Sequence, residues 1–199
     1  MTALKIYGTA QSRAFRTIWM ANELGLPAET VALNFRAGET RTPEFLGVNR
    51  AGHIPAIDDG EMKMGESCAI NFYLAKKHGK LMPADLAGEA RVLEWMFWVM
   101  TDVEKPTLQM LFHAAMLPED QRDPKVVEQS RKDLQWPMTV LNNYLGSNQW
   151  LVGGDFTIAD LSVAAVLAWA KMAKYDFSPF PAVQEWLGRC LGRPAAKVR

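Results

Sequence analysis

The chain has 199 residues, 49% hydrophobic and 22% charged, which is ordinary usage for a globular protein with a large core. Lys plus Arg and Asp plus Glu number 22 each, so this charge balance does not favour nucleic acid or an anionic membrane as a partner. The best apolar run, Val163 to Ala170, is far too short to span a bilayer, and the N-terminus lacks the pattern of a secretory signal.

Cysteine usage points to a reducing environment. Cys68 and Cys190 are the only two cysteines, and they show neither metal-ligand spacing nor a Cys-x-x-Cys motif. We therefore expect a cytoplasmic location. The residues suggest no metal site and no nucleotide cofactor.

The N-terminal part of the chain alternates strand and helix patterns. Apolar residues at helical spacing predict a helix from Arg13 to Leu24, which Gly25 ends. The βαβαββα order of the predicted elements fits a thioredoxin-like α/β layer. These elements are a strand at 4–7, a helix at 13–24, a strand at 30–33, a short helix at 42–46, a hairpin at 56–64 and a helix at 66–77.

Strand patterns disappear in the C-terminal part. Residues 80–88 contain Pro83 and little periodicity, so they predict a linker between a domain at 1–79 and an all-helical bundle domain at 89–199. Pro106 and Pro137 fall inside long periodic segments and are expected to kink or divide them. The helical patterns run over 89–116, 123–146, 157–174 and 181–191.

A capping box opens the third of these helical patterns. Thr157 is expected to cap the Asp160 N–H, while the Asp160 side chain reaches back to the Thr157 N–H. The helix that follows is apolar nearly all round and should be buried. A buried carboxylate is tolerated when it is hydrogen-bonded, so we expect a structural role for Asp160.

Residues 52–67 contain the parts needed to hold a small peptide. The Ile54–Pro55 bond is of the X-Pro kind, in which the cis form costs only about 0.5–1 kcal/mol. A cis bond there would turn the Ile54 main chain outward, where an extended ligand can pair with it as an added strand. Glu66 and Ser67 stand at a predicted helix start, where N–H groups, a hydroxyl and the helix dipole favour a carboxylate. Glu66 can meet an ammonium group beside it.

Either feature alone is more often structural, because most X-Pro bonds are trans and a Glu-Ser pair before a helix is usually a plain cap. Together, in this order, they resemble the glutathione-binding motif of the cytosolic glutathione transferases. In that family a cis-proline loop and a Glu-Ser or Asp-Ser pair hold the tripeptide. The capping box at Thr157 is similar to that of the family's helical domain, so the resemblance spans the whole chain.

The resemblance implies a detoxification enzyme that transfers glutathione to a hydrophobic electrophile. It implies a homodimer, with glutathione as co-substrate and no other cofactor. Conjugation, peroxide reduction, dehalogenation and disulfide reduction share the peptide site, so the reaction subtype stays open. The alternative is a non-catalytic member of the same fold with a regulatory or binding role.

Activation of the glutathione thiol needs a hydrogen-bond donor near the sulfur. Lowering a thiol pKa by about two units from about 8.5 takes roughly 2.7 kcal/mol of preferential thiolate stabilisation. Ser12 stands just before the first helix, with Arg16 one turn later, a spacing similar to that of serine-type transferases. Ser12 can equally be an N-cap, and the two roles are compatible. Thr9 is the second catalytic candidate and Gln11 a further one.

Other residues have smaller roles in the expected site. By likeness to serine-type members, Arg41 is expected to meet the glycine carboxylate of glutathione, and His53 lies where relatives carry a polar residue beside the peptide. No cysteine occurs in residues 8–16, so mixed-disulfide chemistry has no nucleophile at its usual position. We interpret Cys68 as a small core residue.

Overall fold

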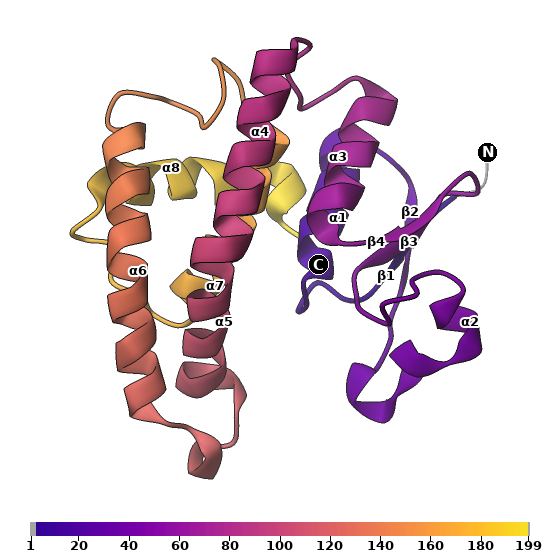
Figure 1. The fold of residues 1–199 in the computed structure, drawn as a ribbon, viewed down its shortest axis with the longest axis horizontal. Coiled ribbons are helices and arrows are strands. Elements are labelled where there is room, and N and C mark those ends of the chain that lie inside the picture. The colour runs from indigo at the N-terminus through magenta and orange to yellow at the C-terminus, as the bar shows by residue number, and fades with distance from the viewer. Residues whose placement is uncertain (1–2, 199) are drawn as a thin grey trace. The chain divides into compact units, whose positions relative to one another are not determined.

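The computed structural model describes residues 3–198, which form two compact units. The N-terminal unit contains residues 3–80 together with residues 193–198, and the helical unit contains residues 81–192. Figure 1 shows a small sheet with helices in the first and helices alone in the second. The predicted classes, thioredoxin-like α/β followed by all-α, are confirmed.

The N-terminal unit is built on a four-stranded sheet with the strand order β2-β1-β3-β4. Strand β1 runs parallel to β2 and antiparallel to β3, while β3 and β4 form the predicted hairpin. The second strand begins two residues earlier than its sequence pattern indicates, since Leu4 pairs with Ala28. The elements are β1 (Leu4–Tyr7), α1 (Ala14–Leu24), β2 (Ala28–Val31), η1 (Phe35–Ala37), η2 (Glu39–Arg41), α2 (Pro43–Leu46), β3 (Ala56–Asp58), β4 (Lys63–Gly65) and α3 (Ser67–His78).

The alternation of side chains in β1 decides what covers each face of the sheet. Leu4 and Ile6 are buried, and Tyr7 points to the other face, where its ring meets the edge of Phe45 from α2. Figure 1 shows α1 and α3 together on one side of the sheet and α2 away from them. The core of this unit therefore lies under α1 and α3, and the loops that precede both helices end up near one another.

The hairpin turn is anchored to α3 by one carboxylate. Asp59 accepts hydrogen bonds from the Tyr73 hydroxyl at 2.7 Å and from the Lys77 ammonium at 2.9 Å. Burial by itself would raise the pKa of Asp59, but these bonds and those from the turn backbone outweigh it and hold the pKa well below its usual range. The anchor fixes the hairpin against α3 and so steadies the connection that leads into that helix.

The last described residues pack against α1. Arg193 donates to both carboxylate oxygens of Glu23, at 2.6 and 2.7 Å, and the Asn22 amide donates to the Ala195 carbonyl. Residues 193–198 therefore group with the N-terminal unit, although the sequence pattern counted them with the helical part. Their contacts are with residues about 170 positions away, which no local pattern reveals.

The helical unit follows the predicted segments closely. Pro106 lies in the first turn of α5, which directly follows the π-helical segment Val99–Val103. The helix therefore changes from α to π winding before Pro106 and continues through it. Pro137 does not divide its helix: α6 continues through it and is held by packing against α5 and α8. The elements are α4 (Leu86–Trp98), η3 (Val99–Val103), α5 (Glu104–Leu111), η4 (Phe112–Met116), η5 (Glu119–Gln121), α6 (Pro124–Leu145), α7 (Ile158–Met172) and α8 (Pro181–Leu191).

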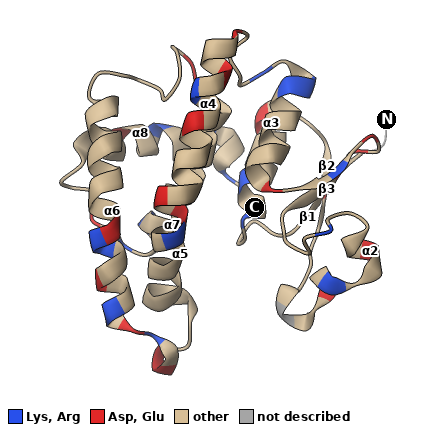
Figure 2. Cartoon of the chain, viewed as in Figure 1, with Lys and Arg blue, Asp and Glu red and all other residues tan. Residues whose placement is uncertain are grey.

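Helix α7 forms the core of the helical unit, and the charged residues of α6 lie in one half of that helix. Nearly every residue of α7 is buried, as its apolar surface predicts. In α6 the charged residues gather in the N-terminal half, which Figure 2 shows in blue and red, while the half beyond Asp133 carries none. The predicted capping box is present at the start of α7, with the Thr157 N–H donating to Asp160 at 3.0 Å.

Candidate functional site

The loop between β1 and α1 starts with a glycine that nothing larger can replace. Gly8 has a φ of +123°, and a Cβ on it would lie 2.7 Å from the Ala14 Cβ, which is too close. The same Cβ position would be 3.3 Å from the Ser12 hydroxyl oxygen and 3.3 Å from the Ile54 Cβ. Gly8 thus lets two of the predicted site residues, far apart in sequence, approach the same point.

Ser12 is half-buried and lies just before α1. Its hydroxyl donates to the Thr9 carbonyl at 2.7 Å, and its oxygen accepts from the Ala14 N–H at 3.1 Å. The residue therefore acts as a local cap for the start of α1. A hydroxyl hydrogen rotates freely, so it can turn from the Thr9 carbonyl to another acceptor while the Ala14 N–H stays on the oxygen.

The Ile54–Pro55 peptide bond is cis. Pro55 is buried and Ile54 is half-buried, directly before strand β3. Ile54 thus lies at the entrance of a strand and beside Gly8, at the end of the sheet where the loop after β1 also lies.

Glu66 and Ser67 stand at the start of α3, as predicted. Glu66 is exposed, has a φ of +66° and makes no capping hydrogen bond with its side chain. A positive φ is uncommon for a residue other than glycine and often marks a functional position. Ser67 is the first residue of the 12-residue helix and is only 5% exposed. The positive end of the α3 dipole therefore lies beside a carboxylate that makes no capping hydrogen bond.

Arg16 joins the two helix starts. It is buried in α1, at 1% exposure, and its Nη1 donates to the Ser67 hydroxyl oxygen at 3.2 Å. Because Arg16 follows Ser12 by one turn, this contact brings the beginning of α1 next to the beginning of α3. The Ser12 and Arg16 spacing in the sequence thus corresponds to a physical link between α1 and Ser67.

Arg41 and His53 flank this cluster on exposed turns. The Arg41 guanidinium donates to the Ala51 carbonyl at 3.0 Å and lies against the backbone of Gly52, whose φ is +63°. His53 is exposed, and its carbonyl accepts a hydrogen bond at 2.7 Å from Asn49. In this structure Arg41 therefore supports the turn that precedes Ile54.

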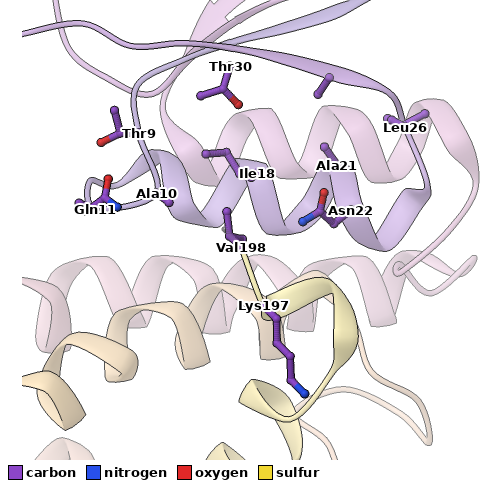
Figure 3. Close-up of a pocket in the computed structure, with 11 residues that line it drawn as sticks. Thr9, Ala10, Gln11, Ile18, Ala21, Asn22, Leu26, Thr30, Lys197 and Val198 are labelled. Carbon is purple, nitrogen blue, oxygen red and sulfur yellow. The ribbon is translucent and has the colours of Figure 1, made fainter.

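Thr9 lies between the predicted site and a separate pocket. A pocket of about 420 Å³ runs along α1 on the side of β2, and Figure 3 shows it bounded by Thr9 and Gln11 at one end and Leu26 at the other. Val198 reaches it from the C-terminal segment. Two of the residues considered for thiol activation, Thr9 and Gln11, line this pocket, whereas Ser12, Ile54 and Ser67 do not, so the pocket is distinct from the cluster that those three residues form.

Sequence reasoning missed one polar residue that supports the cluster. Asn71 is fully buried in α3, and its amide donates to the Arg16 carbonyl at 3.2 Å. It lies one position after the buried Ile70, and an asparagine on the apolar face of a predicted helix is the signal that points to it. It ties α3 to α1 directly behind Ser67.

The part of the chain that the structure describes contains neither a membrane-spanning helix nor a cluster of metal-ligating side chains. No helix among residues 3–198 is both long and apolar enough to cross a bilayer. In the same residues, no group of three or more His, Cys, Asp and Glu side chains is placed to hold a metal ion.

Two family models match the chain. The model described as "Glutathione S-transferase, N-terminal domain" matches residues 2–76, and that described as "Glutathione S-transferase, C-terminal domain" matches residues 105–194.

Individual relatives agree with these matches. The chain is similar to a probable glutathione S-transferase, GSTF1, of Oryza sativa subsp. japonica, with 32% identity covering 99% of this chain and 95% of the relative. It is also 32% identical to the disulfide-bond oxidoreductase YfcG of Escherichia coli (strain K12), over 87% of this chain and 83% of that protein.

Solved structures are similar over almost the whole chain. One is glutathione S-transferase-I bound with the ligand lactoylglutathione, with a TM-score of 0.90, 27% identity and coverage of 98% of this chain and 97% of that one. Another is a glutathione transferase from Burkholderia graminis with two glutathione molecules bound per subunit, with a TM-score of 0.86, 26% identity and coverage of 98% and 85%.

Proposed function

The chain belongs to the glutathione S-transferase family, and we propose that its N-terminal unit binds reduced glutathione and activates the thiol through Ser12. The Ile54 main chain, Pro55, Glu66 and Ser67 hold the tripeptide. The observation that carries the proposal is the approach of Ser12 and Ile54 to one point above Gly8. The contact between Arg16 and Ser67 supports it, because it brings the two helix starts together.

Each end of the peptide has a partner of suitable chemistry. The main-chain N–H and C=O of Ile54 pair with the backbone of the cysteinyl residue, as an added strand does. The Ser67 hydroxyl and the start of α3 donate hydrogen bonds to the carboxylate of the γ-glutamyl end. The Glu66 carboxylate accepts hydrogen bonds from the ammonium group of the same end. Arg41 and His53 lie on the turn before Ile54 and serve the glycine end.

Ser12 acts on the sulfur by hydrogen bonding. When its hydroxyl turns from the Thr9 carbonyl to the sulfur, the Ala14 N–H remains on its oxygen and strengthens the donor. Shifting the thiol pKa from about 8.5 to about 6.5 needs roughly 2.7 kcal/mol, which one charge-assisted hydrogen bond and the α1 N-terminus can supply together. The thiol proton passes to solvent, and a sulfur lone pair then forms the bond to the electrophilic carbon; the bond from that carbon to its leaving group, the halide of an aryl halide, breaks and the group departs with the electron pair.

The test of binding is calorimetric titration of the purified protein with reduced glutathione at two pH values around 7. The expected result is binding with release of a proton, since the bound thiol ionises more readily than the free one. S-methylglutathione is the matched control, because it fills the same site but carries no thiol proton. Absence of binding at millimolar glutathione would contradict the proposal and favour the non-catalytic alternative.

The test of Ser12 compares two substitutions in one loop, each of which removes a hydroxyl group. Ser12→Ala should lower kcat at least about tenfold, or about 1.4 kcal/mol, while the Kd for glutathione stays within about twofold. Thr9→Val, which removes the other candidate hydroxyl, should leave kcat nearly unchanged. The opposite pattern would assign the sulfur contact to Thr9.

Disulfide-bond reduction is the second candidate reaction, favoured by the similarity to the Escherichia coli oxidoreductase. The bound glutathione thiolate would attack one sulfur of a substrate disulfide, form a mixed disulfide with it and release the other sulfur as a thiol. This step needs no protein cysteine, and none occurs at residues 8–16. Parallel assays with an aryl halide and a small disulfide, both with glutathione, distinguish the two reactions.

Assembly and location follow from family likeness. We propose a homodimer in the cytoplasm that accepts a hydrophobic electrophile as second substrate. Cys68 and Cys190 form no disulfide in the structure, which fits a reducing compartment. Sedimentation of the purified protein at micromolar concentration tests the dimer, whose expected mass is twice the 22.3 kDa of the chain.

A further inference from the structure

Asn49 is a buried polar residue in a loop that is otherwise largely exposed. It follows α2 and is 7% exposed, while its neighbours Arg50 and Ala51 lie at the surface. Its backbone is fixed at both ends: its N–H donates to the Phe45 carbonyl and its carbonyl accepts from the Gly52 N–H, each at 2.8 Å. A buried amide with a fixed backbone has one side-chain position, so whatever it contacts is held in a defined place.

The side chain of Asn49 spans the turn that leads to Ile54. Its Oδ1 accepts from the Ala51 N–H at 3.1 Å, and its Nδ2 donates to the His53 carbonyl at 2.7 Å. A carboxamide carries a donor and an acceptor in one plane, which a carboxylate or an aliphatic side chain does not. The second bond fixes the peptide group immediately before Ile54.

The other side of the same amide rests on Gly65. A Cβ built on Gly65 would be 2.6 Å from the Asn49 Cγ and closer still to Nδ2, so the amide lies directly on the glycine backbone. Gly65 ends β4 and is followed by Glu66. The buried Asn49 amide therefore lies between the peptide group before Ile54 and Gly65, the residue before Glu66, and holds the distance between them.

We propose that Asn49 is a positioning residue that sets the spacing between the Ile54 main chain and the Glu66–Ser67 pair, and thereby governs affinity for glutathione. The inference rests on the proposed function, in which one tripeptide contacts both parts at once. A ligand held at two points loses affinity when their spacing changes, even though neither contact group is altered. The Asn49 amide is hydrogen-bonded to Ala51 and His53 and not to Ser12, so we expect its replacement to leave the activation of the thiol unchanged.

The first test separates binding from chemistry. Asn49→Ala should raise KM and Kd for glutathione at least about tenfold, while kcat at saturating glutathione and the pH profile of kcat stay close to those of the unchanged protein. Asn49→Asp keeps the acceptor for Ala51 but loses the donor to His53, and it should show the same pattern. A fall in kcat with unchanged KM would overturn the inference.

The second test displaces the amide without changing it. Gly65→Ala puts a methyl group where the Asn49 amide lies and should raise KM in the same way, since Gly65 does not have the positive φ that would strain alanine. In the double variant the Asn49 side chain is gone and the methyl group has room, so the effect of Gly65→Ala should be much smaller. Additive effects in this cycle would mean that the two residues act independently, which would overturn the inference.

A matched control excludes general loosening of the fold. Asn142 is also a supporting asparagine, since its Oδ1 accepts from the Ala182 N–H at 3.0 Å in the helical unit. Asn142→Ala should lower the melting temperature and leave KM for glutathione unchanged; an equal rise in KM would overturn the inference. Failure of the unchanged protein to bind glutathione would overturn the proposed function and this inference with it. Tight binding by the protein and by all Asn49 variants would overturn the inference alone.

Discussion

Among the acidic residues at helix starts, Glu66 in the N-terminal unit and Asp160 in the helical unit are used by the fold in opposite ways. Asp160, in the first turn of α7, is fully buried and accepts hydrogen bonds from Thr157, the Leu151 N–H at 3.0 Å and the Trp186 ring N–H at 2.9 Å. Glu66, directly before α3, is exposed and caps nothing.

The difference shows how a structural carboxylate is distinguished from a site carboxylate. Burial raises the pKa of Asp160, while the hydrogen bonds from Thr157 and Leu151 act against that shift. All of that carboxylate's bonding capacity is spent within the fold. Glu66 has a φ of +66°, and its side chain makes no capping hydrogen bond at the start of α3. A carboxylate that makes no capping hydrogen bond can accept hydrogen bonds from a ligand.

The largest effect is expected from Asp160→Ala. Three buried donors, the N–H groups of Leu151 and Thr157 and the Trp186 ring, would lose their acceptor, so the free energy of unfolding should fall by about 3 kcal/mol or more. Urea denaturation of the purified variant measures it. Asp160→Asn retains an oxygen acceptor and should lose less. A melting curve for Asp160→Ala that overlays the original would break the comparison.

The reciprocal change at Glu66 should affect binding and leave stability alone. Glu66→Gln removes the charge that, in the proposed function, meets the ammonium group of glutathione, so Kd should rise about tenfold or more, equivalent to about 1.4 kcal/mol. The free energy of unfolding should change by less than about 0.5 kcal/mol, because the side chain is exposed and caps nothing. Calorimetry and denaturation on the same sample measure both. A stability loss like that of Asp160→Ala, with normal binding, would reverse the assignment.

A third carboxylate, Glu23, lies between these extremes and gives a smaller, pH-dependent effect. Its side chain is 7% exposed and it is bonded to Arg193, whose side chain is 32% exposed. Burial alone would raise the pKa of Glu23, but the hydrogen bonds from Arg193 and Trp19 outweigh it and place the pKa below its ordinary value of 4.5. A lowered carboxyl pKa contributes stability above the unfolded-state pKa, and that contribution is lost as the pH falls through the folded-state pKa.

Glu23→Gln should therefore cost about 1 kcal/mol at neutral pH, after allowance for solvent screening, and the difference from the original protein should shrink as the pH falls below about 4.5. Denaturation curves at several pH values measure it. Lys5→Gln, which breaks the exposed pair with Glu29 at 4.0 Å, is the control and should have no measurable effect. A Glu23→Gln difference that does not vary with pH would exclude the ion pair as its cause.

Much of the architecture was predictable because its signals are local. The start of α7 is indicated by Thr157 and Asp160, which are three positions apart. The start of α2 is indicated by the adjacent residues Thr42 and Pro43. Hydrophobic periodicity gave the helices of the second unit to within a few residues. Pro137 was expected to kink or divide its segment, and the division does not occur: α6 is continuous because packing along the helix outweighs one missing N–H, and packing is not visible in a window of sequence.

The motifs of the candidate site are visible in the sequence, whereas their geometry is not. The sequence by itself determined the elements, the Pro55 and Glu66–Ser67 motif and the serine before α1, since each depends on neighbouring residues. Only the tertiary structure decided that Gly8 brings Ser12 to Ile54, and that Arg16 reaches Ser67 across 51 positions. It also decided that Asn49 lies between the two halves of the site. Such contacts depend on how strands and helices pack, and packing is set by the whole unit rather than by any segment of it.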